Sequence, residues 1–164
     1  APHLVLDAFL ELAKEDERLR LVLAGEGPML PRLREKAEHS GLAHRIQLPG
    51  RVPSEEAPAL LQAADLFLNA DQGAPAFGLA NAEALCMGTP VLTTDTGAHR
   101  EVVPESEEGR LVPLSSSITS DLASLIDKLP EEETNRDQRA ARSRERLNRA
   151  LMVERLIACY ENLL

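Results

Sequence analysis

Apolar residues recur at helical and at strand spacing in turn along this chain. Residues 3–16 place apolar side chains three and four positions apart, which predicts a helix, and the short apolar run 19–24 ends at a glycine-rich turn, which predicts a buried strand. The alternation continues to the C-terminus. Further helices are predicted at 29–40, after Ser54, and at 77–87, 99–103, 118–129 and 136–164, and further strands at 45–48, 65–69, 90–94 and 110–112. This order predicts the α/β fold class, with a Rossmann-like parallel sheet and helices on both faces.

Length and charge narrow the classes of function. The 164 residues suit one domain, and an apolar content of 43% excludes a disordered chain. The net charge of -9 disfavours nucleic-acid binding, which requires basic residues against phosphates. Three phenylalanines and one tyrosine are too few for a base-stacking platform or an aromatic sugar-binding strip.

The two cysteines and four histidines form no metal-ligand pattern, so we expect neither a metal nor another cofactor. We expect a reduced, cytoplasmic chain. The two cysteines have no partners at motif spacing, and the sequence has neither a signal segment nor a run of 18 apolar residues. Six arginines between residues 136 and 149 leave two readings open, a membrane-surface contact and a solvated helix face, of which the composition favours the second.

Glycines follow the predicted strands, at the edge where open α/β sheets bind ligands. Each one alone is adequately explained as a turn residue, whereas the whole set favours a site to which a ligand approaches the backbone closely. The set comprises Gly25, Gly27, Gly50, Gly73, Gly78 and Gly97.

The helix predicted at 77–87 carries the sharpest local feature. Free amides at its amino end, together with the helix dipole, would bind a phosphate without a lysine. Glu83 lies four residues after Leu79, so the two share one face about 6 Å apart along the axis. That separation suits a pyrophosphate and its ribose, because a carboxylate would accept hydrogen bonds from the two ribose hydroxyls. Because Glu83 stands among apolar neighbours, we expect its carboxylate to have a partner.

Residues 77–91 (FGLANAEALCMGTPV) resemble a known family. Upstream they are accompanied by 25–28 (GEGP) and 50–52 (GRV), and downstream by 97–101 and 109–113 (GRLVP). In this order and spacing the segments resemble the donor-binding C-terminal domain of family 4 retaining glycosyltransferases, which form half of a GT-B fold. The resemblance spans nearly the whole chain, and implies a single nucleotide-sugar-binding domain over 1–164 that ends in the helix predicted at 136–164.

The resemblance also implies site residues. The family's ribose-binding glutamate falls on Glu83, and the phosphate-binding amides fall on Gly78, Leu79 and Ala80, next to Phe77 of the same motif. The base would lie near Arg51 and Val52, and Gly27 would border the donor cleft. The resemblance assigns no catalytic residue to this chain.

Two departures from the family stand out. The glutamate that contacts the donor sugar in the family falls on Pro75, which has neither a carboxylate nor an amide hydrogen, although Asp71 or Gln72 of the same loop are possible substitutes. The family's first strand, central between those predicted at 19–24 and 65–69, and the acceptor-binding N-terminal domain have no counterpart here. We therefore expect a fragment that depends on that domain or on a complementary chain.

Three hypotheses follow from the sequence. The first is the donor half of a hexosyltransferase that takes its sugar from a nucleotide diphosphate sugar and is inactive as an isolated chain. The second is a nucleotide-binding module without turnover, because of Pro75. The third is a structural partner of another chain.

Overall fold

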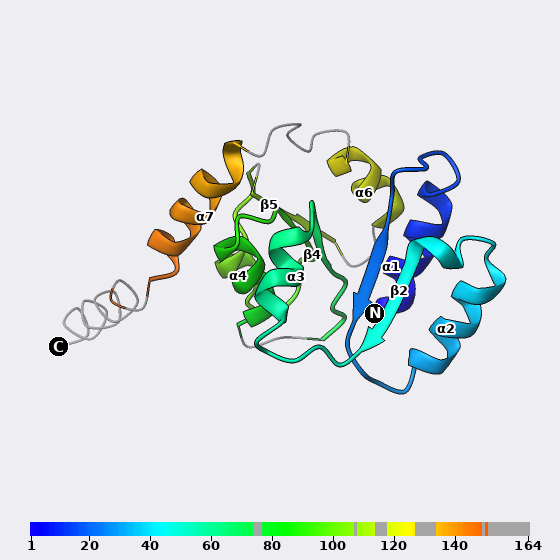
Figure 1. Cartoon of the computed structure of the whole chain (residues 1–164). Helices are drawn as coiled ribbons and strands as arrows, with labels where there is room; N and C mark the ends of the chain where they lie inside the picture. The colour runs from blue at the N-terminus through cyan, green and yellow to red at the C-terminus, as the bar shows by residue number, and fades with distance from the viewer. Residues whose placement is uncertain (74–76, 107, 114–117, 127–133, 149, 151–164) are drawn as a thin grey trace.

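The computed structural model of the chain describes residues 1–73, 77–106, 108–113, 118–126, 134–148 and 150 (Figure 1). Helices and strands alternate as the sequence predicts, and the pairs β1–β2, β3–β4 and β4–β5 are parallel. In chain order the elements are α1 (Pro2–Leu12), β1 (Leu21–Ala24), α2 (Leu30–His39), the 3-10 helix η1 (Ala43–Arg45), β2 (Ile46–Gly50), α3 (Ala57–Ala63), β3 (Phe67–Asn69), α4 (Leu79–Cys86), β4 (Val91–Thr94), α5 (His99–Val102), β5 (Gly109–Val112), α6 (Ile118–Ile126) and α7 (Thr134–Arg146). The predicted α/β class is confirmed.

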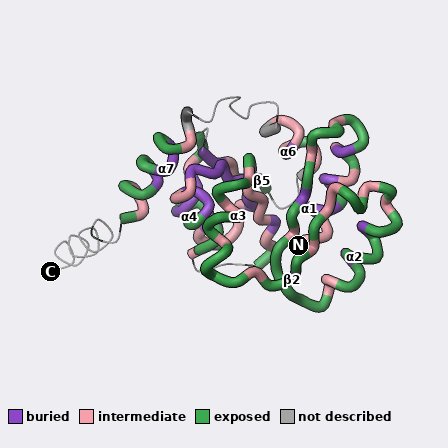
Figure 2. Tube along the Cα trace, in the orientation of Figure 1, coloured by how far each residue is buried: buried purple, intermediate pink, exposed green. Residues whose placement is uncertain are grey.

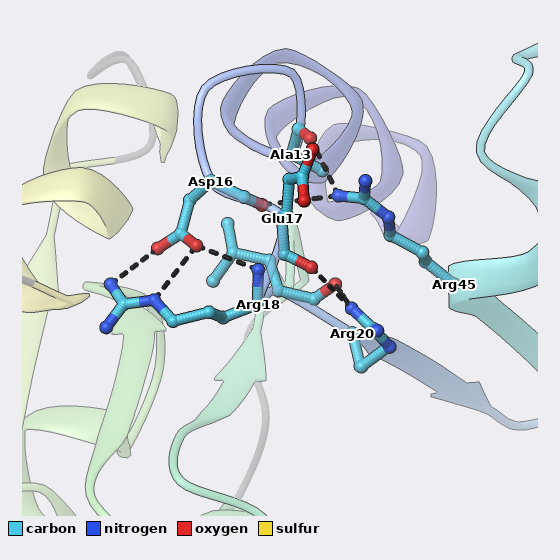
Figure 3. A network of polar contacts seen from close by, with 7 residues as sticks. Ala13, Asp16, Glu17, Arg18, Arg20 and Arg45 are labelled. Atoms are coloured by element: carbon cyan, nitrogen blue, oxygen red, sulfur yellow. Dashed lines mark hydrogen bonds and ion pairs between the residues drawn. The ribbon is translucent and has the colours of Figure 1, made fainter.

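Several helix boundaries differ from the prediction, most clearly those of α1, α3 and α7. Helix α1 ends at Leu12 rather than at residue 16, and residues 13–15 form a turn. Beyond this turn the carboxylate of Asp16 accepts the backbone N–H of Arg18 at 2.8 Å (Figure 3). Helix α3 begins at Ala57, so the Ser54 hydroxyl does not cap it. Helix α7 ends at Arg146 and residues 147 and 148 are not helical; the rest of the helix predicted at 136–164 lies outside the described residues, except for Ala150.

Strand β4 is the centre of the larger sheet, whose order is β3-β4-β5. All four of its residues are at most 2% exposed, as expected for a parallel strand covered on both faces. Successive side chains serve opposite layers. Leu92 packs with Ala8 of α1 and Leu122 of α6, whereas Val91 packs with Leu85 of α4 and Val102 of α5. Figure 2 shows the buried residues gathered around β4 and β5.

Strands β1 and β2 form a separate sheet. Among the described residues no strand pairing joins β1 to β3, the two strands between which the sequence places the absent central strand. Helix α1 packs against both sheets and so connects them. Its Leu6 and Phe9 share a core cluster with Leu21 of β1 and Ala70 after β3, while Ala8 packs against the larger sheet. On the uncovered side of β1, Val22 is 40% exposed.

The prediction of a solvated helix face for the arginines of α7 is correct for Arg142 and Arg144, which are exposed, and wrong for Arg139, which is buried. Arg139 is 5% exposed and donates from Nε to the carbonyl oxygen of Gly88. Arg144 donates to the carbonyl oxygen of Cys86, and Arg136 donates to that of Ala64 after α3. These side chains stabilise helix ends whose carbonyl groups lack intrahelical partners.

Candidate functional site

The loops at the carboxyl ends of the strands meet along one edge, the lower edge in Figure 1. The backbone N–H of Gly25, after β1, donates to the carbonyl oxygen of Gly50 at the end of β2, at 2.7 Å. Between β3 and β4, the Thr94 hydroxyl donates to the carbonyl oxygen of Asp71 at 2.5 Å. Gly25, Gly27, Gly50 and Gly97 all have positive φ, so these turns need residues without a side chain.

Helix α4 starts at this edge with an open amino end. Gly78 is its N-cap in the left-handed conformation (φ 81°, ψ 55°), and no side chain caps the first turn. The first turn contains no acidic residue. Leu79 is 68% exposed and Ala80 is exposed as well, so the first amide groups border solvent. The positive end of the helix dipole is therefore available to an anion.

Glu83 lies one turn further along α4, on the same exposed side as Leu79 and Ala80. The sequence suggested that a carboxylate among apolar neighbours would need a partner, and this argument was wrong. Ala84 and Leu85 are buried at 0% and 1% exposure, and they point the apolar side of α4 at the core while Glu83 remains in solvent. An exposed carboxylate here carries no desolvation penalty and is accessible to a ligand.

A buried polar cluster supports the underside of α4. The Asn69 amide donates to Oδ1 of Asn81 at 3.1 Å, and the Asn81 amide points to the Thr93 hydroxyl at 3.4 Å. That hydroxyl donates to the carbonyl oxygen of Asn69 at 3.0 Å and contacts Nδ1 of His99 at 3.0 Å. Asn81, Thr93 and His99 are each 0% exposed. Nothing in the spacing of the sequence signals that Asn81 and His99 share this cluster.

The remaining predicted residues lie on neighbouring elements of the same edge. Phe77 is half-buried and packs into the core cluster of α4 and β4. Arg51 is exposed and Val52 half-buried directly after β2, and Gly27 is exposed after β1. The structure thus places Leu79, Ala80 and Glu83 on α4, directly after Gly78. This group forms no hydrogen bond or ion pair with Gly27, Arg51 or Val52.

The loop before α4 is described only in part. Pro75 lies outside the described residues. Asp71 accepts the backbone N–H of Gly73 through Oδ1 at 2.9 Å, which folds the loop back after β3, and Gln72 is exposed.

A hollow between α1 and the carboxyl ends of β3, β4 and β5 shares Asn69 and Thr93 with the polar cluster beneath α4. It is lined by Val5, Leu68, Asn69, Ala70, Leu92, Thr93, Thr94 and Val112, and no charged side chain borders it. The open end of α4 is therefore the better candidate site for an anionic ligand.

Within the described part of the chain, no three His, Cys, Asp or Glu side chains are grouped as a metal site would need. None of the described helices is both long and apolar enough to cross a membrane.

The parallel α/β layers and the glycine loops at one sheet edge define a Rossmann-like domain of the kind found in GT-B proteins. Residues 1–146 match the family described as Glycosyl transferases group 1. The chain belongs to this family of glycosyltransferases, as its motifs suggested.

Several bacterial proteins are among the sequence relatives. The phosphatidyl-myo-inositol mannosyltransferase of Mycobacterium leprae is 32% identical over 125 residues, which cover 76% of this chain and 31% of the relative. The alpha-monoglucosyldiacylglycerol synthase of Streptococcus pneumoniae is 35% identical over 88 residues, which cover 54% of this chain and 20% of the relative. The chain therefore spans about a fifth to a third of the length of these two relatives.

Solved structures agree on the fold. Anabaena Alr3699/HepE, crystallised in complex with UDP, superposes with a TM-score of 0.75 at 21% identity, covering 99% of this chain and 45% of that one. The C-terminal domain of the group 1 glycosyl transferase LpcC from Francisella tularensis superposes with a TM-score of 0.70 at 26% identity, covering 88% and 75%.

Proposed function

We propose that this chain binds the nucleotide diphosphate of a sugar donor and is the donor-binding part of a retaining glycosyltransferase. The observation that carries the proposal is the open amino end of α4. Its N-cap is Gly78, which has no side chain to bond the first amides, and Leu79 and Ala80 are exposed next to it. Glu83 is exposed one turn beyond. The amides suit the diphosphate and the carboxylate suits the ribose diol. The similarly folded Anabaena Alr3699/HepE, which was crystallised with UDP and with UDP-glucose, supports this assignment.

The transferred group in this proposal is a hexose. Support comes from the relatives, whose names specify a mannosyltransferase and a monoglucosyl lipid synthase. Because backbone amides and a helix dipole hold the diphosphate, the proposed binding needs no metal ion. The acceptor and the remaining catalytic groups belong to a partner domain, and the reaction takes place in the cytoplasm.

The division between the two sheets supports the need for a partner. The backbone edges of β1 and β3 are not paired with one another, and Ala1 begins α1 beside the carbonyl oxygen of Ala70, at the carboxyl edge of the larger sheet. A strand placed between β1 and β3 and parallel to both would end where α1 begins, as in a βαβ unit. We expect such a segment to complete the sheet, and the isolated chain to be inactive.

Amide hydrogen exchange on Leu21–Ala24 and Phe67–Asn69 tests that completion. In the isolated chain, amides directed at the gap should exchange rapidly, and adding the partner domain should slow them while leaving β4 unchanged. Equally slow exchange before and after addition would overturn the proposed strand.

Calorimetry with UDP, UDP-glucose and GDP tests donor binding. Glu83→Gln should weaken binding of the preferred nucleotide by about 1.5 to 3 kcal/mol if the carboxylate accepts the ribose hydroxyls. Glu38→Gln, an exposed glutamate of α2, is the matched control and should leave the affinity unchanged. Equal affinity of wild type and Glu83→Gln would remove Glu83 from the site.

A second candidate function is nucleotide binding without turnover, favoured by Pro75 at the position of the family's sugar-contacting glutamate. Equal affinity for UDP and UDP-glucose would support it, whereas tighter binding of the sugar nucleotide would support the transferase. If no nucleotide binds, a structural role within a larger assembly is left.

A further inference from the structure

His99 is buried at the start of α5, directly beneath the open end of α4. Its side chain is 0% exposed. Nδ1 lies 2.9 Å from the carbonyl oxygen of Thr94 and 3.0 Å from the hydroxyl oxygen of Thr93. The ring is therefore held on one edge by the end of β4, the central strand of its sheet.

These contacts determine which ring nitrogen carries the proton. The Thr94 carbonyl only accepts, and the single hydroxyl proton of Thr93 is donated to the carbonyl oxygen of Asn69. Nδ1 must then be the donor, so in the neutral ring Nε2 is an acceptor. Nε2 is buried and has no hydrogen-bond partner among the described residues.

The opposite edge of the ring contacts Gly78. A Cβ atom added to Gly78 would lie 2.8 Å from Cδ2 and 3.2 Å from Nε2 of His99, and 3.3 Å from the side-chain nitrogen of Asn81. The ring and the Gly78 backbone are therefore packed so closely that no side chain fits between them. Gly78 is the N-cap of α4, so its position determines where the amides of Leu79 and Ala80 point.

We infer that His99 is a positioning residue for the anion-binding end of α4. Its ring, fixed by Thr94 and Thr93, supports Gly78 in the left-handed conformation and thereby orients the amides that receive the diphosphate. This inference deepens the proposed function and rests on it for the identity of the ligand. The contact between His99 and Gly78 is a property of the unliganded chain and is testable without a ligand.

A double-mutant cycle on the full chain tests the contact. His99→Asn keeps a nitrogen near the Nδ1 position but removes the ring edge beneath Gly78. Gly78→Ala alone should lower the melting temperature and the affinity for inorganic pyrophosphate, a probe that does not depend on the base. In the His99→Asn background the same substitution should cost less, by roughly a tenfold difference in affinity.

Gly88→Ala is the matched control at the other end of α4. Gly88 also has a positive φ, 75°, but an added Cβ would meet the carbonyl oxygen of Arg136 at 2.3 Å rather than His99. His99→Asn should therefore not relieve its effect. Strictly additive effects of Gly78→Ala and His99→Asn on the melting temperature would overturn the inference.

Imidazole nitrogen NMR on the wild type provides a test that needs no variant. In the neutral ring we expect Nδ1 to carry the proton and Nε2 to carry none. The opposite tautomer would overturn the inference, since the ring would not be held by Thr94 as described. The amide resonances of Leu79 and Ala80 should also shift in His99→Asn, whereas those of α2 should not.

The two proposals fail in distinguishable ways. If wild type binds neither pyrophosphate nor UDP, the proposed function fails, and the melting cycle and the tautomer still decide whether His99 supports Gly78. If wild type binds both and His99→Asn binds them equally well, the positioning role fails while donor binding stands.

Discussion

Arg139 of α7 donates from Nε to the carbonyl oxygen of Gly88, 2.9 Å away, directly after the last turn of α4. Arg144 does the same for the carbonyl oxygen of Cys86, also at 2.9 Å. Cationic side chains at a helix carboxyl end satisfy its free carbonyl groups and interact favourably with its dipole. Helix α4 is thus anchored by arginines at one end and left open at the other.

Arg139→Ala should lower the free energy of unfolding by about 1.5 to 3 kcal/mol, because the buried Gly88 carbonyl loses a charged donor. Urea unfolding at neutral pH measures the loss. Arg32→Ala, an exposed arginine of α2, is the control and should change stability by less than about 0.5 kcal/mol. A similar effect of both substitutions would show that the Gly88 contact contributes nothing specific.

Asp16 gives the fold an acid-sensitive contact. The Arg18 guanidinium and backbone N–H hold the pKa of Asp16 at about 2, below its ordinary value of 3.8. Because the folded-state pKa is lowered, the stabilisation is present above pH 3.8 and is lost as the pH falls toward 2. The stability difference between wild type and Asp16→Asn should therefore shrink over that interval in urea titrations.

The control for that titration is Glu11→Gln, an exposed residue of α1 with no ion pair drawn in the structure. Its effect should not depend on pH in the same way. A constant difference between wild type and Asp16→Asn down to pH 2 would contradict the role assigned to Arg18.

Truncation of two leucines of α4 should change the free energy of unfolding by very different amounts. Leu85 is 1% exposed in the core against Val91, so Leu85→Ala should cost about 2 to 5 kcal/mol in unfolding free energy. Leu79 is 68% exposed, so Leu79→Ala should change it by no more than about 0.5 kcal/mol. Denaturant unfolding of both variants compares them. Comparable losses would mean that Leu79 is covered in solution.

Cys86 should react slowly as a thiol. Burial raises its pKa, so less thiolate forms near neutral pH than in a free cysteine. In a Cys159→Ser background, alkylation by iodoacetamide followed by mass spectrometry should be slower than for glutathione, and should reach the free rate once urea unfolds the chain. Folded-state alkylation as fast as that of glutathione would contradict this.

The order of elements was predictable because apolar spacing reports which face of each element is buried. Helix α2 and strand β4 are found within one residue of their predicted ranges. The helix ends were less predictable. Helix α1 gives way to a turn after Leu12, and nothing in the local spacing of residues 3–16 signals that change.

The candidate site likewise has one part that the sequence predicted and one part that it did not. Leu79 and Glu83 lie four residues apart on one helix, so the sequence alone placed them on one face, directly after Gly78. Asn69, Thr93 and His99 come from three separate elements, and only the folded sheet brings them beneath Gly78. The role of the α7 arginines was missed for the same reason, since their acceptors are backbone carbonyls some fifty or more residues earlier in the chain.

The packing of α1 between the two sheets affects how firmly the loops at their carboxyl edge are held relative to one another. Because no strand pairing connects β1 with β3 in the described parts of the chain, the spacing between the loop of Gly27 and the open end of α4 depends on apolar side chains rather than on a backbone ladder. Apolar packing weakens on cooling. In this chain the distance between Gly27 and the amino end of α4 should therefore vary with temperature more than the geometry of either sheet does.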